Sequence, residues 1–222
     1  DKDPGVPLRL LADVTAPVTR NSVKEVYAQV LTDVNEAIKL LPVKATYKTR
    51  PSRAAACALA ARIYLQMGDY DRAMEQATAG LSLQNTLLDY NKVDPEGSPF
   101  DAVFPVTIVS NPEVIFISST TGIYAKNNFI SPDMYQLYNS HDLRTSLFFR
   151  EIPDQGDYQF IGSYNDGGST NVPNPFSGFS VAELYLIRAE CYARKNETGK
   201  AMGDLNTLLV NRFETNAFQP LT

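Results

Sequence analysis

Two stretches of the chain match each other at a constant offset of 128 residues, without gaps. Each stretch has the apolar periodicity of two short helices, and the turn between the helices contains Gly68 in the first copy and Asn196 in the second. Gly and Asn best tolerate the left-handed backbone conformation that commonly ends a helix. The pattern therefore predicts two antiparallel helix pairs. Four identities carry the match: Ala61/Ala189, Tyr64/Tyr192, Ala73/Ala201 and Met74/Met202.

The spacing within each copy indicates how such a pair would pack. Small residues at Ala61 and Ala73 let two helices approach closely, and Tyr64 covers the seam between them. A small residue, a Tyr three residues later and an Ala nine residues after that Tyr resemble a tetratricopeptide repeat. The alternative is two unrelated amphipathic hairpins, and the gapless second copy favours the repeat.

A further helix is predicted over residues 22–41. Ser22 and Glu25 form a capping-box pattern, apolar residues follow at steps of three and four, and Pro42 stops the helix. The second helix pair opens with a similar capping box at Ser180 and Glu183 and runs to about residue 212. Residues 21–85 and 180–213 are therefore expected to form one helical, tetratricopeptide-like frame.

Residues 86–179 separate the two copies and differ from them in composition. They hold 15 of the 23 Tyr and Phe residues, with eight of the 14 Pro and seven of the 12 Gly. Because tandem repeats would follow one another after about 34 residues, this segment is an insertion. We expect an irregular, aromatic-rich lobe with short strands near 113–118 and 157–162 and a short helix after Ser131. The predicted fold class is mainly α, with helix pairs and a long loop-rich insertion containing short strands, in a single domain over residues 1–222.

Charge and reactive groups exclude several classes of function. The net charge of −5 and the pI near 5.0, without any run of Lys or Arg, argue against a nucleic-acid partner. His141 is the only histidine, and its chain neighbours cannot supply a catalytic triad, which is assembled from separated positions. An ion pair of Asp142 with Arg144, or a helix-cap role, is expected in this loop instead. Cys57 and Cys191 are expected to be buried small hydrophobic residues. We expect no catalytic residue, no metal and no cofactor.

Several stretches, in the same order along the chain, resemble the SusD/RagB family, the surface glycan-binding lipoproteins of the Bacteroidetes outer membrane. The resemblance covers most of the chain. The sequence lacks the lipobox Cys of the family and the helical segments that the family would have before Asp1 and after Thr222. This difference indicates a fragment or a truncated form. The matching stretches are Gly5 to Leu8, Arg20 to Pro42 with its Val26-Tyr27, Arg53 to Ala77 with its Gly68-Asp69-Tyr70, Ser131 to Arg144, and Val181 to Arg212 with its Ala182-Glu183-Leu184-Tyr185.

The resemblance implies a role at the cell outer membrane, exposed on the surface. Such a protein binds a glycan or other nutrient and partners a SusC-like TonB-dependent transporter in polysaccharide or oligosaccharide uptake. It is not an enzyme, and it would contact the membrane only through a lipid anchor that is not present in this chain. The alternative function is a tetratricopeptide-type protein–protein interaction scaffold, for which a long aromatic lobe has no use.

Candidate ligand-binding residues lie in two stretches of the lobe, residues 124–129 and 158–166. Sugar binding uses aromatic faces against the apolar faces of sugar rings, and amides or carboxylates for paired hydroxyls. Core packing of the lobe is the alternative role for each aromatic side chain. The candidates are Tyr124, Asn127, Asn128, Tyr164, Asn165 and Asp166.

Overall fold

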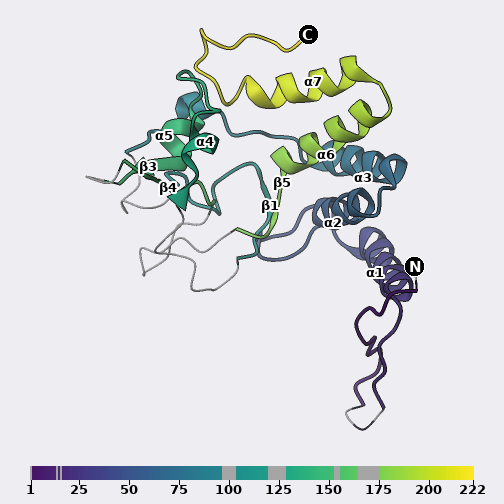
Figure 1. Cartoon of the computed structure of the whole chain (residues 1–222). Helices are drawn as coiled ribbons and strands as arrows, with labels where there is room; N and C mark the ends of the chain where they lie inside the picture. The colour runs from purple at the N-terminus through teal and green to yellow at the C-terminus, as the bar shows by residue number, and fades with distance from the viewer. Residues whose placement is uncertain are drawn as a thin grey trace.

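The computed structural model describes residues 2–13, 15, 17–96, 104–119, 129–152, 156–164 and 176–222. The longer helices form a frame on one side of the molecule, and the short strands and helices of the lobe lie on the other side (Figure 1). The frame helices are α1 (Val23–Leu40), α2 (Arg53–Gln66), α3 (Tyr70–Leu83), α6 (Val181–Arg194) and α7 (Thr198–Leu209).

The frame helices pack in the spatial order α1, α2, α3, α6, α7, so the two repeat copies are neighbours although the lobe separates them in sequence. Alanines make this packing close, since Ala60, Ala61, Ala73 and Ala77 are all completely buried. At the α3–α6 contact, Gly80 leaves room for Leu184, which is also fully buried. The interior of the frame is therefore built from small residues that bring backbones together.

The predicted turns and most of the predicted caps are confirmed. Gly68 and Asn196 have φ values of 74° and 60°, which is the left-handed conformation expected at both turns. Ser22 and Glu25 form the complete capping box, with the Glu25 carboxylate accepting from the Ser22 backbone N–H at 2.8 Å.

The second capping box forms only in part. The Ser180 hydroxyl accepts from the Glu183 backbone N–H, as predicted. The Glu183 carboxylate, however, pairs with Arg62 of α2 at 2.6 Å and does not reach back to the cap. The reciprocal half of this prediction was wrong because a guanidinium from the other repeat copy competes for the carboxylate.

The described part of the lobe contains two small antiparallel sheets. In the first, β1 (Val114–Phe116) pairs with β5 (Phe179–Ser180), which leads directly into α6. The second has the order β2-β4-β3, with β2 (Phe129–Ile130), β4 (Tyr158–Phe160) and β3 (Phe149–Glu151). The helices α4 (Pro132–Tyr135) and α5 (Arg144–Phe148) lie beside this sheet, and η1 (Tyr90–Lys92) precedes it in the chain (Figure 1). The predicted fold class is confirmed, including the short strands and the helix after Ser131.

Residues before α1 leave the frame as an extended arm (Figure 1). The base of the arm is closed by Arg20, whose guanidinium donates to the carbonyls of Pro4 and Gly5. Leu10 and Leu11 of the arm are 66% and 81% exposed. Among the helices that the structure describes, none is long and apolar enough to cross a membrane.

Candidate functional site

The three-stranded sheet of the lobe pairs Phe129, the last residue of the first predicted sugar-binding stretch, with the start of the second stretch. Strand β2 ends the first stretch, strand β4 begins the second, and the two strands pair antiparallel. Phe129 lies opposite Gln159, and Ile130 lies opposite Tyr158. Strand pairing therefore joins, in one surface, segments that are about thirty residues apart in sequence.

One side of this sheet, here called the closed face, is covered by aromatic rings. It carries Phe149, Tyr158 and Phe160, which α4 and α5 cover with rings of their own. Tyr135 of α4 stacks on Tyr158 with ring centroids 3.8 Å apart and planes 12° from parallel. Because these rings are in contact with each other, much of this face is covered, with Phe149 buried and Tyr158 and Phe160 half-buried.

The other side of the sheet, here called the open face, carries Phe129, Gln159 and Arg150 side by side. Consecutive residues of a strand point to opposite faces, so the neighbours of Tyr158 and Phe149 lie on the open side. The register places Phe129 opposite Gln159 and Gln159 opposite Arg150. Phe129 is 49% exposed, and the other two side chains are partly exposed. One residue from each strand thus forms a row across the sheet.

The row combines three complementary kinds of recognition. The Phe129 ring offers an apolar surface for the C–H face of a sugar, Gln159 offers both donors and an acceptor, and Arg150 offers a planar fork of donors. Among the described residues, neither Gln159 nor Arg150 has a hydrogen-bond or ion-pair partner for its side chain. Polar groups left available beside an exposed ring are what a sugar site requires.

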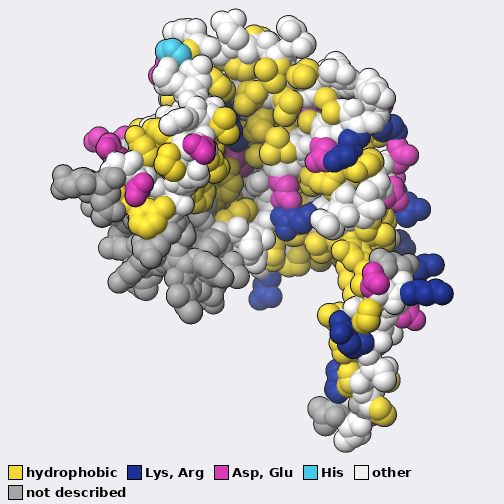
Figure 2. All heavy atoms as spheres, viewed as in Figure 1, with side chains coloured by type: hydrophobic (Ala, Val, Ile, Leu, Met, Phe, Trp, Pro, Cys, Tyr) yellow, Lys and Arg dark blue, Asp and Glu magenta, His cyan; other side chains and the backbone are white. Residues whose placement is uncertain are grey.

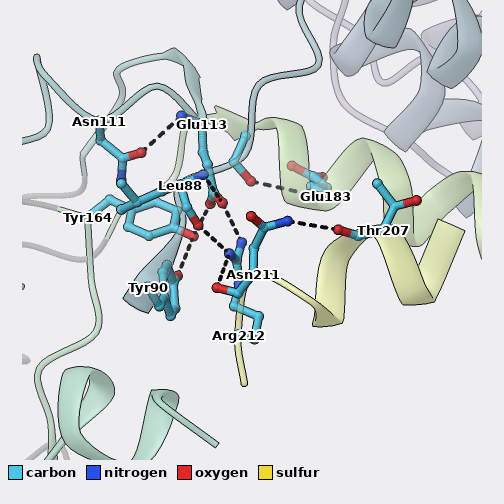
Figure 3. Close-up of polar contacts among 10 residues, drawn as sticks. Leu88, Tyr90, Asn111, Glu113, Tyr164, Glu183, Thr207, Asn211 and Arg212 are labelled. Atoms are coloured by element: carbon cyan, nitrogen blue, oxygen red, sulfur yellow. Dashed lines mark hydrogen bonds and ion pairs between the residues drawn. The ribbon is translucent and has the colours of Figure 1, made fainter. Parts of the chain in front are cut away.

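A second polar cluster, shown in Figure 3, is buried between the lobe and the end of α7. The Glu113 carboxylate accepts from the Tyr164 hydroxyl and from the Leu88 backbone N–H, each at 2.8 Å. It also pairs with Arg212, whose guanidinium lies 4.0 Å from the centroid of the Tyr90 ring. The hydroxyls of Tyr90 and Tyr164 are 3.3 Å apart. These contacts join the lobe to the frame.

Burial governs the ionisation of this cluster. Desolvation raises the pKa of Tyr90 to about 12 and the pKa of Tyr164 well above its ordinary value, while the neighbouring Arg212 opposes both shifts. Both phenols therefore stay protonated at neutral pH and act as hydrogen-bond groups, not as bases. This arrangement is suited to holding two parts of the fold together.

Several known proteins share the fold described above. Residues 4–65 match a SusD-like family model described as starch-binding associating with outer membrane. A SusD superfamily protein of Bacteroides thetaiotaomicron matches with a TM-score of 0.76 at 21% identity, over 100% of this chain and 54% of its own. The chain has a SusD-like fold. The resemblance stated from the sequence is thereby confirmed for the fold, and by the family model over residues 4–65.

Two further solved structures have the same fold as this SusD-like chain. A SusD-like carbohydrate binding protein of Bacteroides vulgatus matches with a TM-score of 0.72 at 19% identity, over 100% of this chain and 50% of its own. Surface glycan-binding protein A of Bacteroides uniformis matches with a TM-score of 0.68 at 18% identity, over 99% and 56%. The SusD-like chain spans about half the length of these structures. No curated protein matches the chain.

The structure places one of the six candidate residues of this SusD-like chain. Tyr164 directs its hydroxyl into the buried cluster, where it donates to Glu113 (Figure 3). Its ring packs edge-on against Phe104 and Phe176. Its role in ligand binding stays a prediction. The other five candidates, Tyr124, Asn127, Asn128, Asn165 and Asp166, lie outside the described residues.

The loop around His141 has the structural role that the sequence suggested. Asp142 is buried and pairs with Arg144 at 2.6 Å, which confirms the predicted ion pair. The His141 ring is 2.8 Å from the carboxylate of Glu214, near the end of the chain. Cys57 and Cys191 are buried free thiols, also as predicted.

Sequence reasoning missed Gln159 and Arg150 of the SusD-like lobe. Their position on the open face depends on which strands pair and in what register, and neither residue stands out in the sequence. The available signal was alternation: Tyr158, Gln159 and Phe160 place a polar residue between two aromatic residues, as in a strand with one packed side.

Proposed function

We propose that this SusD-like chain belongs to a cell-surface glycan-binding protein, which captures a polysaccharide or oligosaccharide at the outer membrane. The family description of residues 4–65 and the names of the matching carbohydrate-binding proteins support this class of function. The observation that supports one particular binding surface is the set of side chains on the open face. There, a half-exposed Phe129 lies in one row with the available side chains of Gln159 and Arg150.

The remaining candidates are close in sequence to the residues of this surface. Asn127 and Asn128 directly precede Phe129 in sequence, and Asn165 and Asp166 follow Tyr164. We propose that these amides and the Asp166 carboxylate supply further bonds to sugar hydroxyls, and that Tyr124 supplies a second ring. Replacing Tyr124 by Ala should weaken glycan binding if this ring contributes.

Uptake would require a partner in the membrane. We propose that the partner is a SusC-like TonB-dependent transporter and that a lipid anchor holds the complete protein at the cell surface. The sheet that carries the open face lies in the lobe, apart from the frame helices, so docking of the frame on a transporter would not cover this sheet (Figure 1). Co-purification of the tagged protein with a transporter from an adjacent gene would test this part.

We propose that the protein binds its glycan without cleaving it. Glycoside cleavage commonly uses two free carboxyl groups on either side of the scissile bond. Within the described part of the lobe, the buried carboxylates of Glu113 and Asp142 are each held by an Arg. The protein should therefore retain intact polysaccharide in an affinity gel and release no shorter sugars. Release of shorter sugars would overturn the proposal that it is not an enzyme.

A peptide-binding scaffold is the alternative, and one surface favours it. A groove beside α1 is lined by Val23, Tyr27, Ala28 and Leu31 of that helix and by Gln66 and Met67 at the end of α2. A scaffold would bind a peptide there and would not depend on the lobe. Glycan binding that is lost in Phe129→Ala but kept in Tyr27→Ala would assign function to the lobe.

A further inference from the structure

We propose that the open face selects a glycan whose mostly neutral chain carries an isolated carboxylated sugar, and that Arg150 binds the carboxylate. This inference rests on the proposed glycan-binding function and names the class of ligand. It concerns three described residues, Phe129, Gln159 and Arg150, and the surface that they share.

Arg150 differs from the other arginines near the lobe because it has no acidic partner among the described residues. Arg144 is paired with Asp142, and Arg212 with Glu113. A guanidinium fork matches the geometry of a carboxylate and forms two parallel charge-assisted hydrogen bonds with it. A fork kept available beside an exposed ring is therefore suited to an acidic sugar.

The acidic residue next to Arg150 in sequence does not neutralise it, because Glu151 lies on the closed face. Strand alternation places Glu151 opposite Tyr158 rather than opposite Gln159. The negative charge of Glu151 contributes to a raised pKa of Tyr135, whose main cause is burial, and this agrees with a position near the Tyr135–Tyr158 stack. Arg150 thus remains a positive group on the open side.

The surrounding charge limits how many acidic sugars the lobe can accept. The chain carries a net charge of −5, and the charged side chains seen over the lobe in Figure 2 are mostly acidic. Asp133, Glu151, Asp154 and Asp157 are the acidic residues nearest to this sheet in sequence. A uniformly charged polyanion would be repelled by this field, whereas a single carboxylate on a neutral chain would meet Arg150 at close range.

The row also has the length for two adjacent sugar units. Neighbouring strands lie about 4.8 Å apart, so Phe129 and Arg150 are separated by about 10 Å across the sheet. A neutral ring stacked on Phe129 would place its neighbour, or a branch on it, over Gln159 and Arg150. The amide of Gln159 would then bond to hydroxyls between the two.

The test compares oligosaccharides that differ only in the carboxylate. The ligands are oligosaccharides that carry one glucuronic acid, prepared from glucuronoxylan and from arabinogalactan. Each is titrated against the protein in a calorimeter before and after reduction of its carboxyl group. Polygalacturonate is titrated as the example of a uniformly charged polyanion. We expect at least one acidic oligosaccharide to bind about ten-fold or more tightly than its reduced form, and more tightly than polygalacturonate. Equal affinity for acidic and reduced forms, or no binding of any acidic oligosaccharide, would overturn the inference.

Variants separate this inference from the proposed function. Arg150→Gln should weaken binding of the acidic form much more than binding of the reduced form and so remove the preference, whereas Arg150→Lys should keep part of the preference. Phe129→Ala should weaken the binding of the acidic and the reduced oligosaccharide by the same factor. If Arg150→Gln keeps the preference, the inference fails. If neutral glycans bind in a Phe129-dependent way while the carboxylate has no effect on affinity, only the inference about the acidic sugar fails. If Phe129→Ala changes the binding of no glycan, both the inference and the proposed function fail. Circular dichroism confirms that each variant is folded.

Discussion

Glu113 and Arg212 form an ion pair that is almost completely withdrawn from solvent, with side chains 0% and 4% exposed. Glu113 directly precedes β1 of the lobe, and Arg212 follows α7 of the frame, so the pair bridges the two parts of the fold. Arg212 also donates to the Leu88 carbonyl at 2.8 Å. The lobe is therefore attached to the frame by charge as well as by packing.

Removing the positive partner should be costly, because it leaves a buried carboxylate unpaired. We expect Arg212→Met to lower the free energy of unfolding by about 3–5 kcal/mol, measured by urea denaturation. The double variant Glu113→Gln with Arg212→Met should lose less than the sum of the two single changes. The control is Arg194→Met, which breaks an exposed pair with Glu190 and should lower stability far less, because water screens that pair. Equal losses for Arg212→Met and Arg194→Met would contradict a structural role for the buried pair.

Alkaline pH should destabilise the same cluster. The pKa of Tyr90 is about 12 in the folded protein, mainly through burial, and near 10 in the unfolded chain. The unfolded state therefore releases this proton first, so the contribution is fully present below about pH 10 and is lost as pH rises towards 12. The loss per tyrosine approaches about 1.4 kcal/mol per pH unit.

Urea unfolding between pH 9 and pH 12 would measure this dependence in wild type and in Tyr90→Phe. The variant should show a shallower fall in stability over this range. The matched control is Tyr47→Phe, since Tyr47 is 69% exposed and lies outside the cluster. A profile for Tyr90→Phe that is parallel to wild type would show that this phenol does not couple to folding.

Close packing between the repeat copies should depend on Gly80. A Cβ atom at this position would lie 2.8 Å from Cδ1 of Leu184, which is fully buried and has little room to move. We expect Gly80→Ala to lower stability by about 1–3 kcal/mol despite its better helix propensity. Thermal and urea unfolding would measure the change.

Gly203 provides the matched control within α7. An added Cβ there meets no described atom within 4 Å, so only helix propensity should act. Gly203→Ala should stabilise the protein by up to about 1 kcal/mol. If both substitutions were stabilising, the α3–α6 contact would be looser than the structure shows.

The frame could be predicted from sequence because its signals are local. The capping box of Ser22 and Glu25, the turn residues Gly68 and Asn196 and the alanine spacing all act within a few residues along the chain. The structure reproduces each of them. The exception, Glu183, failed for a non-local reason, since its partner Arg62 is 121 residues away.

The candidate site could be predicted only to the level of its two stretches. Aromatic composition pointed to residues 124–129 and 158–166, and the β2–β4 pairing places Phe129 of the first stretch opposite Gln159 of the second. Which side chains share a face depends on register, which a single sequence does not display for strands of two or three residues. The row of Phe129, Gln159 and Arg150 and the partnership of Glu113 with Tyr164 both depend on such long-range pairing.

Calorimetric titration of wild type, Phe129→Ala and Leu137→Ala with a panel of neutral and acidic oligosaccharides tests the central claim most directly. Leu137 is 84% exposed on the same lobe, so its variant controls for the loss of exposed apolar area. We predict that wild type and Leu137→Ala bind the same glycan with equal affinity and that Phe129→Ala binds it about ten-fold more weakly. Glycan affinity unchanged in Phe129→Ala, with the variant folded, would contradict recognition through the open face.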